Sequence, residues 1–284
     1  MAPAKNKRTH PEVLGSEMLC RDTRRTLIKL LIHHAVQQST LPGGLPHLCV
    51  AVHRPPGPSL LQLPAAPLSS FPIMDWQAFW NERYNVDDYV FGTEPNDFLR
   101  SVADQIPPGP VLCLGEGEGR NAVHLASLGH PVLAVDQSAN GLAKAHGLAK
   151  HRGLSIETAV ADMADFQILP GHWSAIISIF LHLPPELRRS VNQRAVLGLR
   201  PGGLYVSEHY TPAQLAHGTG GPKEVALLPT LALLREDLQG LELVIGRELE
   251  RSVVEGSAHT GQAAVVQVLA RKGGATPSAE TSWT

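Results

Sequence analysis

The sequence has little cysteine and little excess charge. Its 284 residues include only three cysteines, Cys20, Cys49 and Cys113, none in a CxxC pair. An odd and scattered set of this kind argues against a disulfide framework or a zinc site, so we expect no metal and a reducing, cytoplasmic location. The formal net charge of −2 indicates neither a nucleic-acid partner nor a membrane surface.

Long hydrophobic runs are also missing. The best candidate, "TLIKLLIHHAV" (26–36), is interrupted by Lys29 and two histidines. It is shorter than the roughly 20 apolar residues that span a bilayer, so we expect no membrane insertion. The hydrophobic content of 43% and the charged content of 18% are instead typical of a soluble chain that buries a full core.

Residues 1–73 differ from the rest of the chain in charge and in pattern. They carry eight Lys or Arg against three acids, whereas residues 74–284 carry 16 against 23. Proline is frequent over 42–72, and no period of 2 or 3.6 is sustained, so the segment lacks the material for a core. Two interpretations stay open: an organelle-targeting presequence, or an extension without a fold ahead of a domain that starts near Met74. We favour the extension, because the Ser-rich amphipathic helix of transit peptides is absent.

From residue 111 onward, short apolar runs alternate with helix-like segments. The runs expected to be strands are 111–114, 131–135, 154–160, 173–180 and 204–209. Helices are expected after the glycines that follow the first run, from Ser138 to a stop at Gly153, and over 182–199, with an "RPGG" turn at 200–203. This alternation predicts right-handed crossovers and a parallel sheet covered on both faces.

The last part of the chain breaks this alternation. Two strand-like runs, 241–250 and 263–270, have no helix between them and are expected to pair as an antiparallel hairpin. The polar stretch that joins them, 251–262, contains His259 and is expected to fold over the mouth of the site as a lid. Residues 74–272 then form one domain, and residues 273–284 form a flexible tail.

The stretch "LCLGEGEGRNAVHLASLGH" (112–130) places three glycines, Gly115, Gly117 and Gly119, between a strand and a helix. Glycines bring such a turn close to a ligand without side-chain obstruction. Glu116 and Glu118 would repel a pyrophosphate seated there, but they are tolerated beside a cationic sulfonium or α-ammonium group. A dinucleotide fingerprint with Gly117, Gly119 and Ala122 is a weaker reading, which keeps a nicotinamide-dependent oxidoreductase as an alternative.

Two acids follow successive strand candidates. Asp136 ends the second run and is placed to accept hydrogen bonds from ribose hydroxyls. Asp162 follows the third run, where it can meet an adenine amino group. Each acid alone is equally well a helix cap or a solvated loop residue, but together they favour a ligand site at the carboxyl edge of the sheet.

The motifs "GEGEGRNA", "AVDQS", "ADMADF", "SIFLHLPP" and "LRPGGLYVSEHYTP" resemble, in this order, a class I S-adenosylmethionine-dependent methyltransferase over about 76–272. The stretches at 79–99, 218–222 ("GTGGP") and 253–272 are similar, more narrowly, to small-molecule methyltransferases of the tellurite-resistance and thiopurine type. The resemblance implies an α/β fold with a doubly wound, Rossmann-like sheet, mostly parallel with a C-terminal antiparallel hairpin. It also implies S-adenosyl-L-methionine as the cofactor.

The resemblance further implies that an aromatic N-terminal segment covers the cofactor. The residues assigned to the cofactor are Gly115, Glu116, Gly117, Gly119, Asn121, Asp136, Gln137, Asp162, Met163, Phe180, Trp80, Tyr89 and Phe91. Many relatives carry an acid two residues before the first glycine, where this chain has Cys113. Glu116 or Glu118 is expected to take over part of the task of that acid, and Cys113 to be an ordinary buried residue.

Ligands of open α/β sheets bind beyond the carboxyl ends of the strands, so the residues after the fourth and fifth strands are the catalytic candidates. His182 is equally well a general base, a pocket-lining residue or a loop histidine, and His209 and Tyr210 are placed similarly. The expected reaction is methyl transfer to a small acceptor that is a soft nucleophile: a thiol, selenium or tellurium species.

The absence of an obvious dedicated base pair agrees with such an acceptor, because it ionises readily. The alternatives are the oxidoreductase and a protein that binds the cofactor without catalysis. Nucleic-acid methylation is weaker, because residues 74–284 are acidic and lack a basic cluster. Nothing in the sequence indicates the oligomeric state.

Overall fold

The computed structural model describes residues 75–274 of the chain. The expected extension over 1–73, the start of the domain near residue 74 and the tail beyond residue 274 lie outside the described residues, so they stay predictions. Within 75–274, the helices are α2 (Trp76–Arg83), α3 (Asp97–Val102), α4 (Arg120–Ser127), α5 (Ala139–His151), α6 (Pro185–Gly198) and α7 (Leu231–Asp237). Short 3₁₀ turns lie at Ala103–Gln105, Pro212–Ala216 and Val225–Leu227.

The strands form one sheet in the order β3-β2-β1-β4-β5-β7-β6. They are β1 (Val111–Leu114), β2 (Val132–Asp136), β3 (Glu157–Val160), β4 (Trp173–Ile179), β5 (Leu199–Tyr210), β6 (Leu241–Glu255) and β7 (His259–Lys272). The first five strands pair in parallel, and β7 runs antiparallel between β5 and β6. The mostly parallel sheet with a C-terminal antiparallel hairpin is therefore confirmed.

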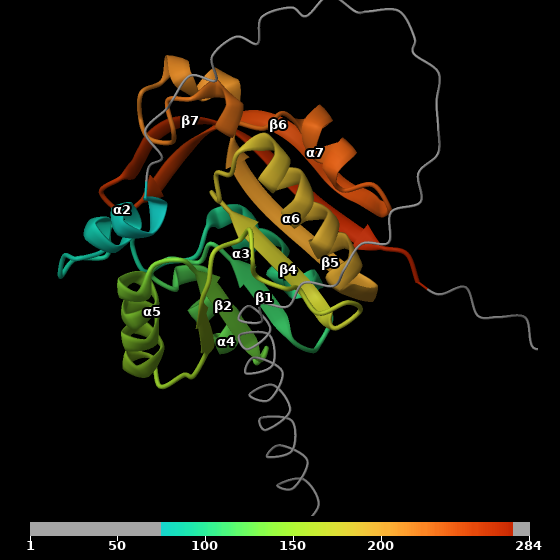
Figure 1. The fold of residues 1–284 in the computed structure, drawn as a ribbon, viewed down its shortest axis with the longest axis horizontal. Helices are drawn as coiled ribbons and strands as arrows, with labels where there is room; N and C mark the ends of the chain where they lie inside the picture. Colours follow the sequence, from blue (N-terminus) through green and yellow to red (C-terminus); the bar gives the residue numbers. More distant parts are fainter. Residues whose placement is uncertain (1–74, 275–284) are drawn as a thin grey trace, which may run out of the picture. The chain divides into compact units, whose positions relative to one another are not determined.

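Helices cover both faces of this sheet, and Figure 1 shows α6 in front of it and α4 behind it. On the face of α3, α4 and α5, a core of side chains from the helices meets alternate residues of the central strands; it includes Leu99, Val123, Leu142, Val111, Ile177 and Val206. The continuous apolar runs of β1 and β4 are buried along their whole length, because both faces of a central parallel strand are covered.

Local signals place several helix ends where the sequence predicts them. The Ser138 side chain accepts a hydrogen bond from the Gly141 backbone N–H and caps α5. The helix ends before Gly153, which has φ +68°. Because β1, β2 and β4 run in parallel and in register, the loops that follow them meet at one edge of the sheet. That edge carries the predicted site.

The expected loop over 251–262 is wrong, whereas the expected role of this stretch as a lid stays a prediction. Strand β6 continues to Glu255 and β7 begins at His259, so only a three-residue turn joins them. The pairing persists because the polar residues of this stretch, Arg251 and Glu255, have buried partners on other elements, which a single sequence does not reveal. The "RPGG" turn is likewise an irregularity inside β5, where the register with β4 shifts between Trp173 and Ala175.

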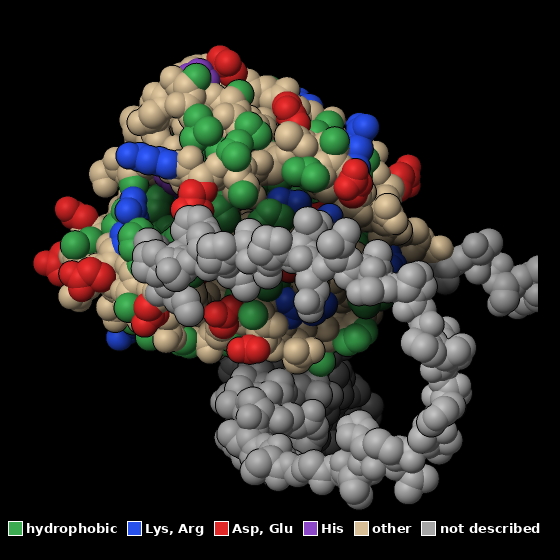
Figure 2. All heavy atoms as spheres, turned by 45° about the horizontal axis from the view of Figure 1, so that its top comes forward, with side chains coloured by type: hydrophobic (Ala, Val, Ile, Leu, Met, Phe, Trp, Pro, Cys, Tyr) green, Lys and Arg blue, Asp and Glu red, His purple; other side chains and the backbone are tan. Residues whose placement is uncertain are grey.

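Among residues 75–274, no helix is both long and apolar enough to cross a membrane. The same part of the chain contains no group of three or more His, Cys, Asp or Glu side chains arranged to hold a metal ion. Figure 2 shows one face of the molecule, on which acidic and basic side chains are interspersed with hydrophobic ones.

Candidate active site

The three glycines after β1 are required by both their backbone conformation and their neighbours. Their φ angles are +61°, +60° and +91° for Gly115, Gly117 and Gly119. A Cβ on each would lie 2.5–2.6 Å from an atom of Leu181, Tyr84 and Ala145, respectively. A side chain at any of these positions would collide with one of these neighbours, so the turn requires glycine; its close approach to a ligand stays a prediction.

Glu116 is buried and caps α4 instead of facing outward. Its Oε1 accepts hydrogen bonds from the backbone N–H groups of Asn121 (2.9 Å) and Ala122 (2.7 Å). Burial raises the pKa of Glu116 to about 7, although these bonds and Arg120 favour the ionised form. A pyrophosphate in a dinucleotide-binding fold uses the N–H groups of this first helical turn. The Glu116 carboxyl group occupies two of these N–H groups, so they are not available to a pyrophosphate. This argues against dinucleotide binding at the loop.

Glu118 holds the N-terminal segment in place. Its carboxylate accepts hydrogen bonds from the backbone N–H groups of Val90 and Phe91, both at 3.2 Å, and lies 2.5 Å from Lys144 Nζ. Cys113 is fully buried beneath the loop, as expected for an ordinary strand residue, and burial together with Glu116 raises the pKa of its thiol. Both acids between the glycines thus have structural partners.

Asp136 lies at the end of β2, against the glycine loop. Its Oδ2 accepts a hydrogen bond from Gly117 N and its Oδ1 accepts one from Ser138 N, both at 2.8 Å. A carboxylate oxygen accepts more than one hydrogen bond, so both oxygens keep capacity for ligand hydroxyls. Burial raises the pKa of Asp136, although the hydrogen bonds donated by backbone N–H groups oppose this rise.

The other predicted cofactor residues on this edge lie around Asp136 and the loop. Asp162, exposed after β3, accepts a hydrogen bond from Ala164 N at 2.8 Å, and Met163 beside it is buried. The Asn121 side chain accepts from Asn96 N at 3.0 Å, and the carbonyl of Gln137 accepts from the Gln77 side chain at 3.2 Å. Their roles toward the cofactor stay predictions.

The aromatic N-terminal segment, residues 76–91, lies over the loop, and the sequence analysis did not assign a role to its buried Tyr84. Tyr84 stacks on Trp80, with ring centroids 5.6 Å apart, and fills the space beside Gly117 and Gly141. Burial, Asp136 and Glu118 raise the pKa of Tyr84 well above its usual value. Its position four residues after Trp80, on the same face of the helix, was the available signal.

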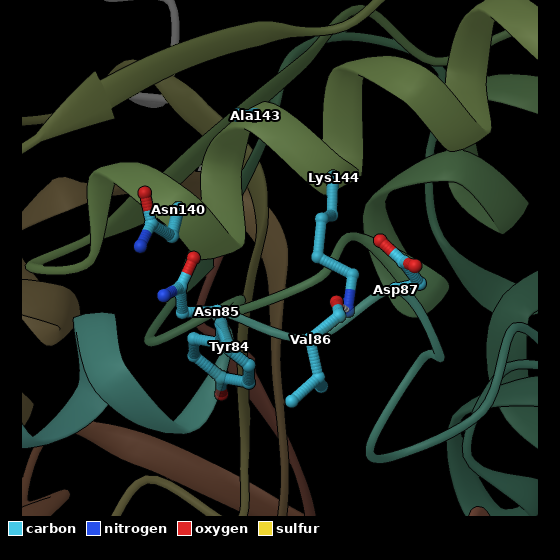
Figure 3. Close-up of a pocket in the computed structure, with 7 residues that line it drawn as sticks. All are labelled: Tyr84, Asn85, Val86, Asp87, Asn140, Ala143 and Lys144. Atoms are coloured by element: carbon cyan, nitrogen blue, oxygen red, sulfur yellow. Dashed lines mark hydrogen bonds between the residues drawn. The ribbon is translucent and has the colours of Figure 1, made fainter.

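Lys144 of α5 ties this covering segment to the body of the domain. Its ammonium group donates hydrogen bonds to the carbonyls of Val86 (3.0 Å) and Asp88 (2.5 Å), and the Tyr89 hydroxyl donates to the carbonyl of Lys144 (3.1 Å). Figure 3 shows Lys144 reaching from α5 toward the chain near Val86. Both residues line a hollow of about 260 Å³. Hydrogen bonds with both Lys144 and Glu118 therefore hold the covering segment against the domain.

Beyond the ends of β4 and β5 lies a group of rings that we call the aromatic cluster: Phe91, Phe180, His182, Tyr210 and His259. Phe180 is 4.6 Å from Tyr210 and 4.9 Å from His259 between ring centroids, and Phe91 is 4.6 Å from His259. Among residues 75–274, Phe180 is the only non-glycine residue with positive φ (+52°). Such strain is characteristic of functional sites.

The three predicted catalytic residues meet at this cluster. The His182 ring lies 5.8 Å from Tyr210 and 6.1 Å from His209. Burial lowers the pKa of His182 to about 4 and, with His182 and Arg188 nearby, that of His209 to about 3. Burial, followed by Glu255 and Glu208, raises the pKa of Tyr210 well above its usual value. All three are uncharged near neutral pH.

A network of buried charged and polar side chains, from Asn96, Arg120, Glu208, Arg251 and Glu255, lies beside the cluster. Asn96 Nδ2 donates hydrogen bonds to Glu208 Oε1 (2.8 Å) and Glu255 Oε1 (2.9 Å). Arg251 pairs with both carboxylates, and Arg120 Nη2 lies 2.6 Å from Glu255 Oε2. The network joins the covering segment, the glycine loop, β5 and the hairpin. The hairpin turn also contacts the covering segment, because Ala258 N donates to the Val90 carbonyl at 3.3 Å.

Comparison with known proteins bears on what this edge of the sheet does. Residues 111–203 match the family model of a methyltransferase domain. This match covers the glycine loop, Asp136, Asp162 and β4, the elements that form the predicted cofactor side. Residues 111–203 therefore form a methyltransferase domain. No curated protein matches the chain.

Solved structures share the fold of this methyltransferase. A structure from work on the conversion of a disulfide bond into a thioacetal group during echinomycin biosynthesis has a TM-score of 0.59 and 19% identity, over 72% of this chain and 92% of that one. TehB from Haemophilus influenzae has a TM-score of 0.51 and 22% identity, over 69% of this chain and 66% of that one. Geranyl diphosphate C-methyltransferase from Streptomyces coelicolor has a TM-score of 0.52 and 14% identity, over 71% of this chain and 99% of that one.

The groups around the glycine loop suit S-adenosylmethionine. The cofactor has ribose hydroxyls, and the buried Asp136 carboxylate can accept hydrogen bonds from them. It also has positive charges, which the acidic side chains around the loop favour. The three glycines carry no side chain that could reach into the turn, and the atoms that a Cβ would meet belong to Leu181, Tyr84 and Ala145. In the methyltransferase, Asp136 and the loop backbone would hold the nucleoside end, and the aromatic segment with Tyr84 would exclude water.

Proposed function

We propose that the methyltransferase transfers its methyl group to a small acceptor with a soft nucleophilic atom, a thiol, selenium or tellurium species. One observation carries this proposal. The candidate bases His182 and His209 have pKa values lowered to about 4 and 3 by burial, so each is a weak base near neutral pH. A hydroxyl acceptor needs a competent base, whereas a thiol, with a pKa of about 8.5, can ionise without one.

S-adenosylmethionine, when bound, supplies a methyl carbon that an ionised acceptor attacks in one displacement, leaving the electron pair on the cofactor sulfur. The protein aligns the acceptor with the methyl group and excludes water from the reacting atoms. Trp80, Tyr84 and Phe91 pack together beside the loop, and Phe180 packs against Tyr210 beyond the end of β4. His182 and His209, held neutral beside these rings, would not take a proton from the acceptor.

Two likenesses support the same acceptor class. The motifs over 79–99, 218–222 and 253–272 resemble tellurite-resistance and thiopurine methyltransferases. Sulfur chemistry is also the subject of the echinomycin study whose structure shares the fold. We further propose that the protein works in the cytoplasm, where a reducing environment keeps thiol acceptors free. No nucleic-acid partner is part of the proposal.

The test is a product screen. The purified protein is given S-adenosylmethionine with an isotopically labelled methyl group and, separately, small thiols, selenite, tellurite and phenols, and products are detected by mass spectrometry. We expect methylated sulfur, selenium or tellurium products and a rate that follows ionisation of the acceptor as pH rises. Methylation of phenols alone would overturn the acceptor class. Cofactor binding without any product would favour a non-catalytic binding protein.

Variants of the candidate bases sharpen this test. His182→Ala, His209→Ala and Tyr210→Phe should each lower turnover on a thiol by less than the roughly 10²–10⁴-fold that follows loss of a general base. A larger loss in one variant, with cofactor affinity intact, would identify that residue as a base and shift the proposal toward an oxygen or nitrogen acceptor.

A further inference from the structure

The motif "GTGGP" at 218–222 follows β5 and the 3₁₀ turn at Pro212–Ala216. We call these five residues the second glycine loop. Its three glycines all have positive φ: +65° at Gly218, +142° at Gly220 and +81° at Gly221. Residues with a side chain rarely adopt such angles, so the backbone of this loop by itself favours glycine at these positions.

The second glycine loop lies directly against two rings of the aromatic cluster. A Cβ on Gly221 would lie 2.6 Å from Tyr210 Cδ2, and one on Gly220 would lie 3.1 Å from Tyr210 Oη and 3.2 Å from His259 Cδ2. A Cβ on Gly218 would meet nothing within 4 Å. Gly221 is exposed, whereas Tyr210 is only 1% exposed, so the loop backbone covers part of this ring.

A buried side chain holds the loop in this place. Gln214 Nε2 donates hydrogen bonds to Thr219 Oγ1 (3.0 Å) and to the Gly220 carbonyl (3.2 Å). Gln214 Oε1 accepts from Ala264 N of β7 at 2.9 Å, and Thr219 Oγ1 donates to the Gln262 carbonyl at 2.5 Å. These bonds tie the loop to β7, so side chains fix its position over the cluster.

Polar atoms without partners lie on the inner side of the loop. His259 Nδ1 and His182 Nε2 are buried and have no hydrogen-bond partner within 75–274. The His182 ring stacks on Tyr210, with ring centroids 5.8 Å apart. His259 meets the loop through Cδ2, and Nδ1 is on the other edge of an imidazole ring. Buried polar groups have partners with few exceptions, so a ligand or water belongs beside these nitrogens.

We propose that the backbone of Gly220 and Gly221 is the outer wall of the acceptor site, so that these two glycines limit the size of the acceptor. This inference rests on the proposed function, because it concerns the acceptor of the same site. An acceptor bound against Tyr210 meets this wall. A larger acceptor must displace the loop and break the hydrogen bonds from Gln214. The site therefore selects the smaller of two chemically similar acceptors.

The loop, and not the ring, moves when Gly221 gains a side chain. Tyr210 is packed against Phe180, His259 and His182, with ring centroids 4.6, 5.4 and 5.8 Å away. The loop has neighbours on its inner face but is exposed at Gly221. A close-packed interior resists displacement, so Gly221→Ala pushes the loop outward and enlarges the acceptor site.

The experiment compares benzenethiol with naphthalene-2-thiol, two aromatic thiols that ionise alike and differ by one fused ring. Isothermal titration in the presence of S-adenosylhomocysteine gives the affinity for the larger thiol relative to the smaller one. Gly221→Ala should raise this ratio by about tenfold, the lower end of what a methylene-sized change in a pocket is worth. Gly218→Ala has similar backbone strain without the contact and should leave the ratio unchanged. An unchanged ratio in Gly221→Ala, or an equal rise in both variants, would overturn the proposal.

A second pair of variants loosens the loop without enlarging a side chain. Thr219→Val loses the hydrogen bonds with Gln214 and Gln262, so the ratio should rise by about two- to tenfold, the range for one net hydrogen bond. Thr158→Val loses a bond to His146 on β3, at the opposite edge of the sheet, and should not change the ratio. Equal weakening of both thiols by Thr219→Val would contradict a wall.

Mass-spectrometric detection of methylated thiols in the same samples tests the proposed function separately. A shifted ratio with no methylated thiol would contradict the soft acceptor but support the wall, whereas methylated thiols with an unshifted ratio would do the reverse. Because a wall acts on size and not on the nucleophilic atom, phenol and 2-naphthol should show the same shift if the acceptor is an oxygen nucleophile.

Discussion

The two sides of the site hold their buried acids in different ways. Beside the glycine loop, Glu116 accepts from backbone N–H groups five and six residues further along, and Asp136 accepts from Ser138 N and Gly117 N. Below the aromatic cluster, Glu208 and Glu255 are held by side chains from distant elements, and the Asn96–Glu255 bond spans 159 positions. The half that we propose for the cofactor is a local backbone structure, whereas the half that we propose for the acceptor exists only once the sheet has closed.

This difference has consequences for stability. A carboxylate held by backbone N–H groups keeps its partners whenever the local turn forms. A carboxylate held by arginines in a buried network leaves uncompensated charge when one member is removed, and such losses are among the most destabilising single changes. The acceptor side should therefore be the more fragile one.

The largest effect is expected from Glu208→Ala. It leaves Arg251, Asn96 and Gln267 without their shared acceptor in a fully buried position, and the free energy of unfolding should fall by about 3–5 kcal/mol. Urea denaturation measures the change. Glu250→Ala, an exposed change on β6, is the control and should cost less than about 1 kcal/mol. Similar losses in both variants would mean that the network does not carry the stability assigned to it.

The glycines on either side of α4, Gly119 before it and Gly129 after it, distinguish the cost of backbone strain from the cost of crowding. Gly119 and Gly129 have φ of +91° and +90°, so alanine costs about 1–2 kcal/mol at either position. A Cβ at Gly119 would also lie 2.5 Å from Ala145 Cβ, whereas nothing lies within 4 Å of one at Gly129. Gly119→Ala should therefore destabilise by a further 1–3 kcal/mol or so in urea denaturation. An equal cost at both sites would show that α5 moves away freely.

Cofactor affinity tests the two acids that follow β2 and β3. Asp136→Ala should weaken S-adenosylmethionine binding by about 1–3 kcal/mol in isothermal titration, since a buried hydroxyl partner is lost. Asp162→Ala, at an exposed position, should weaken it less, by about 0.5–1.5 kcal/mol. Should Asp136→Ala bind the cofactor as the unmodified protein does, Asp136 would be removed from the site.

The last effect concerns pH. The pKa of Glu116 is raised to about 7 in the folded state, above the value of about 4.3 in an unfolded chain. The folded state therefore binds the proton more tightly, and this contribution to stability is fully present below about pH 4.3 and lost as pH rises through 7. Glu116→Gln, which keeps an acceptor for Asn121 N and Ala122 N, removes the titration.

The measurement for Glu116 is the free energy of unfolding of both proteins between pH 5 and pH 8. The unmodified protein should lose stability relative to Glu116→Gln as pH rises through this range. A difference that stays constant with pH would show that Glu116 is ionised throughout, as a helix cap with an ordinary pKa would be.

The sequence by itself determined the parts of this protein that depend on neighbouring residues. The buried runs of β1 and β4, the cap of α5 at Ser138 and its stop at Gly153 were all predicted correctly. The glycine loop and the place of Asp136 were predicted as well, because conformational freedom and strand order are properties of a short stretch. These features make up most of the cofactor side.

Only the tertiary structure decided the acceptor side. The polar stretch 251–262 has the composition of a loop, yet β6 and β7 extend through it, because Arg251 and Glu255 pair with residues that the sequence places 43 to 159 positions away. Tyr84 and Lys144 gain their roles in the same way, by contact across the sheet edge. Buried charges are stable only beside their partners, and no local pattern in one sequence records which distant residue that partner is.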